Sequence, residues 1–379
     1  MIETESSASK DDKGNYSLKT EEMEKRLKQS LGIDVSKSNL SLSLGFLNER
    51  LVKEFKSRPD VSNDIKGYKI LLKWIKTSVD PNVELLVVME ATGVYHQGIA
   101  HYLYEHGHSV CVMQSGRVKR YAQSLDQRSK TDALDSRMLS MLGLERNIRL
   151  WHPPSEELQE LKGLSRERSS LLNDRTMETN RQGAIASSVH SNVRALKRHK
   201  IRLKLLNTQI EAVEEEMRSL IADNEELKRK LEYLTSIPGV SFVSAATVIG
   251  ETLGFESIVN AKQLASYAGY DVVLRESGNY KGKTRISKKG NSHIRAVLHM
   301  PSMTCVRCNP TLKQYYNRLK PNKAKPLVAL VAVQRKLLIL MYTLWKNEEN
   351  YDDEYEIKKQ QKHEALAARD NSLINQPVS

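Results

Sequence analysis

Two patterns of apolar residues alternate along the first 150 residues, and together they predict a mixed α/β domain. Leu40, Leu42 and Leu44 alternate with serines, which is the period-two pattern of a half-buried strand. The segment 83–89 is almost wholly apolar and ends at Glu90, as expected for a strand buried on both faces. Between such strands, apolar residues recur every three or four positions, which predicts helices. We therefore expect a sheet covered by helices.

The order of the expected elements in this region follows from the same patterns. Two adjoining strands are expected over 31–44, and further strands at 51–55, 83–90 and 109–113. Helices are expected over 63–77, 95–105, 117–124 and 131–144, and one more over 20–31.

From residue 155 to residue 234 the composition changes. Glycine and proline become rare, charged residues dominate, and leucines recur at mixed three- and four-residue spacings. This pattern predicts a long helical hairpin or coiled coil with a break near 183–193. Its expected role is that of a spacer or a dimer arm.

Residues 235–346 are predicted to form a second, mainly helical globular unit. Residues 237–250 resemble a helix-hairpin-helix, whose turn can offer backbone N–H groups to a phosphate. Helices are expected over 264–270, 292–305 and 326–345, and the Gly- and Lys-rich residues 275–290 are expected to form a loop or a loose hairpin. The predicted division of the chain is a mobile tail (1–27), an α/β domain (28–150), a helical linker (151–234), the second unit (235–346) and a polar tail (347–379).

Composition restricts the class of partner. The chain has 379 residues, a formal net charge of +13 and three cysteines. The odd cysteine number favours a reducing compartment, and the acidic, polar N-terminus does not resemble a secretory signal. No apolar run approaches the roughly 20 residues of a membrane span. We therefore expect a cytoplasmic protein with a polyanionic partner, and nucleic acid in preference to a membrane.

Four acidic residues occupy positions that suit a metal site. Asp34 interrupts the first apolar strand, and Glu90 ends a buried strand at its carboxyl end, where α/β sheets place their ligands. Asp132 and Asp135 are three residues apart on a predicted helix, so they share one face. Hard divalent ions prefer several carboxylate oxygens, and paired ions can clamp both oxygens of a phosphoryl displacement. This order of elements fits a ribonuclease-H-like nuclease.

A strongly basic segment lies in the second unit. Residues 275–325 contain 13 Lys or Arg and one acid, Glu276. Such an imbalance is unusual for a solvated surface, where both signs mix. Ser277 is expected to donate a hydrogen bond to a phosphate, because its chemistry alone makes a nucleophile the weaker alternative. The residues expected to contact nucleic acid, with Tyr280 stacking on a base, are Arg275, Tyr280, Lys281, Lys283, Arg285, Lys288, Lys289 and Arg295.

An ordered set of motifs resembles the DEDD-type insertion-sequence transposases, the family now described as bridge-RNA-guided recombinases. The resemblance covers about residues 30–345, and the extended N-terminal tail departs from it. In the amino half the motifs are GIDVSK (32–37), EATGVY (90–95) and KTDALDSR (130–137). In the carboxyl half they are SIPGV (236–240), ASYAG (265–269), ESG (276–278), RISKKGN (285–291) and MP (300–301).

The resemblance implies a complete mechanism. It implies a RuvC-like domain that binds two magnesium ions through Asp34, Glu90, Asp132 and Asp135, a coiled coil, and a transposase domain. In that domain Ser277 would attack DNA, so the resemblance raises this serine to the nucleophile. It also implies a composite site between protomers of a dimer or tetramer, and a structured guide RNA that pairs with target and donor DNA.

Two alternatives remain open at the level of sequence. In the first, the chain is a RuvC-like junction nuclease that uses metal-activated water, and Ser277 only binds phosphate. In the second, it is a non-enzymatic nucleic-acid-binding scaffold built around the coiled coil. Loss of activity on changing the four acids would exclude the scaffold, and a covalent protein–DNA adduct would exclude water attack.

Overall fold

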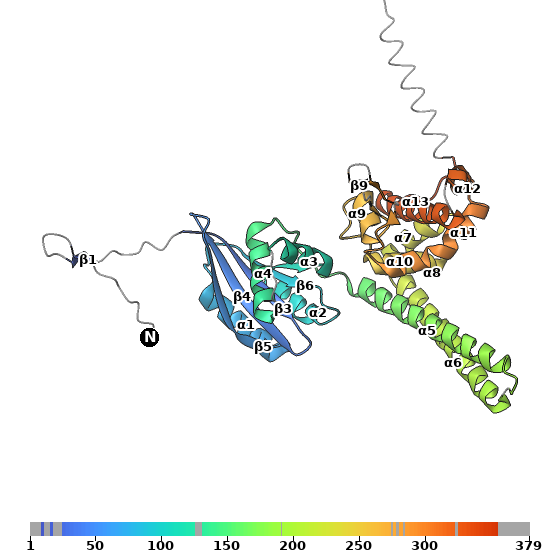
Figure 1. Cartoon of the computed structure of the whole chain (residues 1–379), viewed down its shortest axis with the longest axis horizontal. Helices are drawn as coiled ribbons and strands as arrows, with labels where there is room; N and C mark the ends of the chain where they lie inside the picture. Colours follow the sequence, from blue (N-terminus) through green and yellow to red (C-terminus); the bar gives the residue numbers. More distant parts are fainter. Residues whose placement is uncertain are drawn as a thin grey trace, which may run out of the picture. The chain divides into compact units, whose positions relative to one another are not determined.

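The chain divides into two compact units, residues 1–153 and residues 154–379. The computed structural model (Figure 1) describes residues 9–10, 16–17, 25–125, 131–190, 192–273, 276–277, 280–282, 285–322 and 325–354.

The first unit is built on one mixed five-stranded sheet (Figure 1). Its strands, in spatial order, are β5 (Lys53–Ser62), β4 (Asn39–Asn48), β3 (Arg26–Val35), β6 (Leu85–Glu90) and β7 (Ser109–Met113). Strands β3, β4 and β5 are antiparallel neighbours, whereas β6 runs parallel to β3 and β7 runs parallel to β6. The predicted mixed α/β sheet is confirmed. A separate pair of two-residue strands, β1 (Ser9–Lys10) and β2 (Tyr16–Ser17), precedes it.

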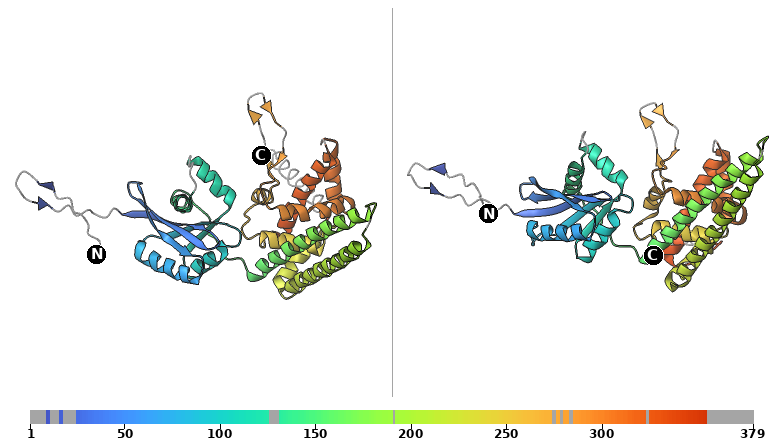
Figure 2. Two further views of the ribbon diagram at one scale, coloured as in Figure 1. Left: turned by 60° about the horizontal axis from the view of Figure 1, so that its bottom comes forward. Right: turned by 90° about the horizontal axis from the view of Figure 1, so that it is seen from below.

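Helices cover both faces of this sheet (Figure 2). On one face, α1 (Ile65–Ser78) and α2 (His96–Glu105) bury their apolar residues against alternate residues of β3, β4 and β6. On the other face, α3 (Ser115–Ser124) and α4 (Asp132–Glu145) form a second core with Val88 and Cys111. The sheet is therefore buried on both sides, as the apolar run of β6 predicts.

The prediction of a helix over 20–31 is wrong for the residues of this range that the structure describes from Arg26 onward. These residues begin β3, where Gln29 pairs with Phe46 of β4 and with Leu85 of β6. The amide of Gln29 also donates to Asp80 O and accepts from Asp80 N, both at 2.9 Å. Pairing with two strands on either side decides the conformation here, and helical periodicity does not report such distant contacts.

The second unit starts with a long helical hairpin, in which α5 (Glu156–Ala186) and α6 (Val193–Ala222) lie side by side (Figures 1 and 2). Ser155 caps α5 and Asn192 caps α6, each by accepting a backbone N–H of the first turn. The predicted break at 183–193 contains the turn between the two helices. The hairpin is observed, and a coiled coil remains a prediction.

The rest of the second unit is mainly helical. Its helices are α7 (Glu225–Thr235), α8 (Phe242–Thr252), α9 (Ala261–Tyr267), α10 (Ser292–Val297), α11 (His299–Cys308), α12 (Pro310–Leu319), the 3₁₀ helix η1 (Lys320–Asn322) and α13 (Pro326–Asn347). Two small antiparallel pairs lie between α9 and α10: β8 (Val272–Val273) with β11 (Arg285–Ile286), and β9 (Glu276–Ser277) with β10 (Tyr280–Lys281).

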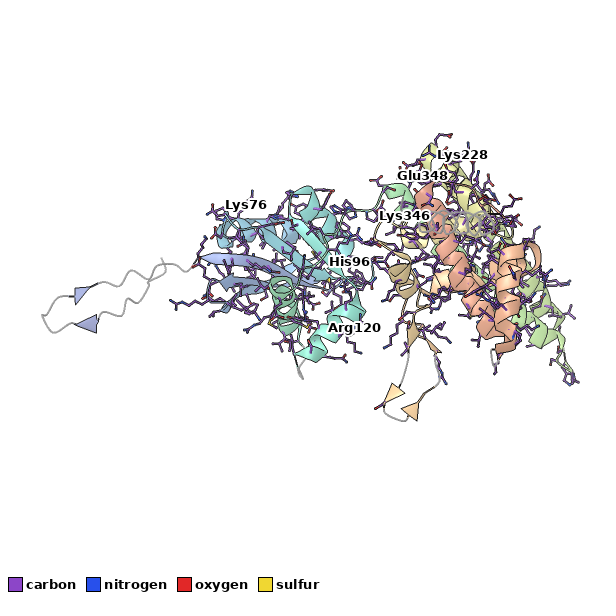
Figure 3. The ribbon with its side chains drawn as sticks, turned by 90° about the horizontal axis from the view of Figure 1, so that it is seen from above. Lys76, His96, Arg120, Lys228, Lys346 and Glu348 are labelled. Atoms are coloured by element: carbon purple, nitrogen blue, oxygen red, sulfur yellow. The ribbon has the colours of Figure 1, made fainter. Side chains whose placement is uncertain are left out.

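Among the described residues, helix α13 is long and apolar enough to cross a membrane by length and composition alone. In this fold it is a core helix, because Val333, Leu337 and Met341 are fully buried in the main cluster of the second unit. Just beyond its end, Glu348 pairs with Arg229 of α7 at 3.4 Å. Figure 3 shows Glu348 near Lys228 and Lys346 at this end of the unit.

Candidate functional site

The site in the first unit depends on how closely α4 approaches β3. A Cβ added at Gly32 would lie 1.9 Å from Ser136 O and 2.4 Å from Ser140 N, both backbone atoms of α4. The hydroxyl of Ser140 donates to Ser30 O at 2.7 Å, which fixes the helix on the strand. Only glycine at position 32 leaves room for the helix backbone, so this residue of the GIDVSK motif has a steric role.

The same contacts give the direction of α4. Ser136, early in the helix, lies over Gly32, whereas Gly143, near its end, lies against the side chain of Ser30. The helix therefore runs antiparallel to β3, and its first turn lies at the carboxyl end of that strand. Asp132 and Asp135 are the acidic residues of this turn.

Asp34 and Glu90 face the same helix. Asp34 lies two residues beyond Gly32, so it is on the same face of the sheet. Glu90 lies two residues beyond Val88, which packs in the core under α4. Gly32 and Val88 are paired in parallel register, so Asp34 and Glu90 end neighbouring strands side by side. The four predicted acids thus belong to one end of one face of the first unit.

The four carboxylates offer the oxygen donors that a hard divalent cation prefers. In this structure, however, they are too far apart for three of them to bind one ion. All are oxygen donors, and Asp34, Glu90 and Asp135 are half-buried while Asp132 is exposed. Within the residues described, no three His, Cys, Asp or Glu side chains are close enough together to hold one metal ion.

Asn63, which the sequence analysis missed, connects the loops that follow the two acidic strands. Its Nδ2 donates to Ser36 O at 2.9 Å and to Tyr95 O at 3.1 Å. Its Oδ1 accepts from the hydroxyl of Tyr68 at 2.7 Å, which orients the amide. Ser36 follows β3 and Tyr95 follows β6, so one amide joins the ends of the strands that carry Asp34 and Glu90. No local sequence signal distinguishes this asparagine from an ordinary loop residue.

The second candidate region is the basic segment of the second unit. Ser277 is exposed and lies in β9, paired with Tyr280 of β10. Arg285, Lys288 and Lys289 are exposed as well. Arg275 and Lys283 lie outside the described residues, as do the side chains of Tyr280 and Lys281. The four acids belong to the first unit and Ser277 to the second.

Residues 288–291 of the basic segment are held firmly by backbone contacts. Lys288 N donates to Gly269 O at 3.1 Å, and Asn291 N donates to Tyr267 O at 2.7 Å. A Cβ at Gly290 would meet Gly269 N at 2.5 Å, so two glycine backbones touch here. This contact explains the glycines of the ASYAG and RISKKGN motifs as packing residues.

Two polar residues of this region, Arg295 and Ser287, have structural partners. The guanidinium of Arg295 donates to Ala268 O at 2.7 Å and to Gly290 O and Asn291 O at 3.2 Å each. The hydroxyl of Ser287 donates to the carboxylate of Asp271. Arg295 therefore stabilises the backbone of the basic segment, and its contact with nucleic acid stays a prediction.

Beneath this segment lies an ion pair with a buried carboxylate and an exposed arginine, which no sequence pattern indicates. Glu251 of α8 is fully buried, and Arg166 of α5 donates to its two oxygens at 2.9 and 3.2 Å. Asn291 Nδ2 donates to the same carboxylate at 2.7 Å. Burial raises the pKa of Glu251, but the hydrogen bonds from Arg166 and Asn291 outweigh it and hold the pKa below its ordinary value. Glu251 thereby connects the helical hairpin to the basic segment.

The turn predicted to be a helix-hairpin-helix joins α7 to α8. Gly239 has a left-handed φ of +99°, and a Cβ there would lie 2.9 Å from Cys305 N. The turn thus packs on α11, and Ser241 caps α8 by accepting from Ser244 N at 3.3 Å. The contact of this turn with a phosphate stays a prediction.

Comparisons with known proteins agree on one family. Residues 31–191 match the DEDD transposase model of IS110, and residues 231–317 match the model for transposases of the IS116/IS110/IS902 family. The chain is 28% identical to a pilin gene-inverting protein of Moraxella lacunata over 77% of this chain and 89% of that protein.

Two further matches are more distant. An uncharacterised 43.6 kDa protein of insertion element IS110 from Streptomyces coelicolor is 25% identical over 39% of this chain and 37% of its own length. Among solved structures, T. thermophilus RuvC in complex with a Holliday junction substrate matches 33% of this chain and 99% of its own length. That match has 11% identity and a TM-score of 0.25.

Proposed function

The chain belongs to the IS110/IS116 family of DEDD transposases, and on that premise we propose that it mobilises an insertion sequence by cutting and exchanging DNA strands. The observation that carries this proposal is the placement of Asp34, Glu90, Asp132 and Asp135. The close contact of α4 with Gly32 brings the two acids of the helix to the strand ends that carry the other two. We further propose that the domain is ribonuclease-H-like.

The proposed role of the four acids is to bind magnesium, as two ions. A bound divalent ion would neutralise charge on the scissile phosphate. Asp34 and Glu90 are held by paired strands, so they define one side of the site rigidly. Asp132 and Asp135 belong to the first turn of α4 and form the other side. A cation among them would offset repulsion between neighbouring carboxylates, which favours binding.

The proposed nucleophile is the hydroxyl of Ser277. Its Oγ forms a bond to phosphorus, the bond from phosphorus to the leaving strand breaks, and the proton of the serine passes to solvent as the leaving oxygen gains one. The exposure of Ser277 in a basic segment supports the proposal, because a DNA backbone can reach it and nearby cations such as Arg285, Lys288 and Lys289 attract that backbone.

Two further parts of the proposal rest on the resemblance and on net charge. A structured guide RNA selects the target and donor DNA by base pairing, and the excess of +13 suits a protein that holds both RNA and DNA. The protein acts as a dimer or tetramer, in the cytoplasm at the nucleoid.

The acids are tested by substitution with neutral amides. Asp34→Asn, Glu90→Gln and Asp135→Asn each remove one charge while they keep the shape, and each is expected to abolish strand cleavage of element-end DNA in Mg²⁺. The melting temperature without Mg²⁺ checks that each variant is folded. Glu105→Gln, an exposed acid on α2, is the matched control and should cleave normally. Full strand exchange by any of the three variants would contradict the proposed site.

A further inference from the structure

Charge is strongly segregated along the helical hairpin. Residues 181–204, named the basic arm here, contain seven Lys or Arg and no Asp or Glu. Residues 211–226, nearer the core of the unit, contain seven Asp or Glu and one Arg. Solvated helices of a spacer normally mix both signs, because neighbouring opposite charges stabilise the helix. Solubility alone therefore does not explain this segregation of charge.

The cations of the basic arm are available to a partner. Arg194, Lys197, Arg198, Lys200 and Lys204 are all exposed on α6. In the part of the chain that the structure describes, none of these five forms an ion pair with a carboxylate. Their charge is consequently not neutralised by an ion pair among the described residues.

A buried polar cluster fixes the orientation of this helix. Glu178 of α5 is 4% exposed, and it contacts His199 Nδ1 of α6 at 2.6 Å and Arg202 Nη1 at 3.2 Å. Arg181 completes the cluster at 3.4 Å. Because His199 points inward to α5, the lysines two residues before it and one residue after it are turned outward. The arm is a defined basic surface on a rigid hairpin.

The basic arm of a second copy of the chain is a poor partner for this surface. Ile201 and Leu205 are exposed on α6 at 69% and 58%. Lys197, Lys200 and Lys204 surround them, so two such faces brought together would place uncompensated like charges in contact. A polyanion gains from the same arrangement, since its charges meet the lysines and its sugar edges cover Ile201 and Leu205.

We propose that the basic arm binds the phosphate backbone of double-stranded DNA, as a contact separate from the acids and from Ser277. The inference rests on the protein acting on DNA and does not require the serine chemistry. Residues 194–204 rise about 15 Å along α6, a length over which one strand of B-DNA carries about four phosphates. The arm therefore matches several consecutive phosphates and reads no base.

The test compares two charge-reversed variants of the full chain. The arm variant carries Lys197→Glu, Lys200→Glu and Lys204→Glu. The control carries Lys66→Glu, Lys69→Glu and Lys73→Glu, which are exposed lysines of α1 in the first unit. Both variants lose the same formal charge. The dissociation constant for a labelled duplex DNA without element sequences is measured between 50 and 300 mM salt, and circular dichroism checks folding.

The arm variant is expected to bind duplex DNA at least about tenfold more weakly at low salt, with a salt slope about 2–3 smaller, since each lost phosphate contact contributes roughly 0.9. The control should change both quantities much less. Equal losses in both variants, or no loss in the arm variant, would overturn the proposal. Weaker binding to duplex RNA with unchanged binding to duplex DNA would overturn it as well.

Two additions keep the result interpretable. If the Glu substitutions disturb the hairpin, the Lys→Gln versions remove the same phosphate contacts without adding repulsion, and the same comparison applies. The measurement is repeated in a Ser277→Ala background. If Ser277 is not the nucleophile, the difference in DNA binding between the arm variant and the control remains. The proposal for the basic arm and the proposal for Ser277 can therefore be refuted separately.

Discussion

Gly32→Ala tests the packing that brings the four acids together. The added methyl would lie 1.9 Å from Ser136 O and 2.4 Å from Ser140 N, whereas non-bonded heavy atoms prefer about 3.5 Å. Neither neighbour is a flexible side-chain tip, so α4 must withdraw from β3 by at least about 1 Å. Overpacking of this kind costs about 1–3 kcal/mol. For a unit of this size that is a fall in melting temperature of about 2–10 °C.

The withdrawal of α4 also moves Asp132 and Asp135 away from Asp34 and Glu90. A misplacement of about 1 Å in a catalytic constellation can lower the rate roughly 100-fold. Differential scanning calorimetry measures the stability, and cleavage of labelled element-end DNA measures the rate. Gly32→Ala should therefore lose both stability and, to a much greater extent, activity.

Gly163→Ala is the matched control for this prediction. Gly163 lies within α5, and a Cβ there meets no atom within 4 Å. Alanine should stabilise the helix there by up to about 1 kcal/mol and leave cleavage unchanged. If Gly32→Ala melts and cleaves like the wild type while it is correctly folded, the proposed contact between α4 and β3 is refuted.

Two further predictions concern the second unit. Lys288→Ala with Lys289→Ala should weaken binding to all DNA sequences alike and reduce the salt slope by about 1–2, as measured by fluorescence anisotropy; an unchanged slope would show that these lysines only face solvent. The pKa of Glu251 is lowered from its ordinary value of 4.5, so its contribution to stability is complete above that pH and is lost as pH falls through the lower, folded value. Thermal unfolding should show the wild type well above Glu251→Gln at pH 7, and the difference should shrink below about pH 4. A difference that does not change with pH would contradict the charged state of this pair.

Local patterns were sufficient for most elements of the fold. The alternation of Leu40, Leu42 and Leu44 and the continuous run of β6 are properties of neighbouring residues, and both predicted strands are present. The helix prediction failed at residues 26–31 because their conformation depends on pairing with β4. Their partners there include Phe46, Gly45 and Leu44, at some distance along the chain. A periodicity rule has no access to such contacts.

The candidate site was also predictable only in part, because local sequence patterns reveal some of its residues and not others. The four acids stand out by residue type and by their places at strand ends and on one helix face. The residues that support them do not stand out, because Gly32, Asn63 and Glu251 act through neighbours that the fold brings to them. The role of Ser277 follows from the family resemblance, since an exposed serine in a basic segment has no local mark of a nucleophile.

The most direct test of the account is a search for a covalent bond between Ser277 and DNA. Wild-type protein, Mg²⁺, guide RNA and end-labelled DNA are mixed, stopped in detergent and resolved by denaturing electrophoresis. If Ser277 is the nucleophile, a labelled protein–DNA adduct forms in the wild type and in Ser287→Ala. None forms in Ser277→Ala, which should still fold and bind DNA. Cleavage by the wild type without any adduct would show that water is the nucleophile, and an adduct that persists in Ser277→Ala would contradict the role of this serine.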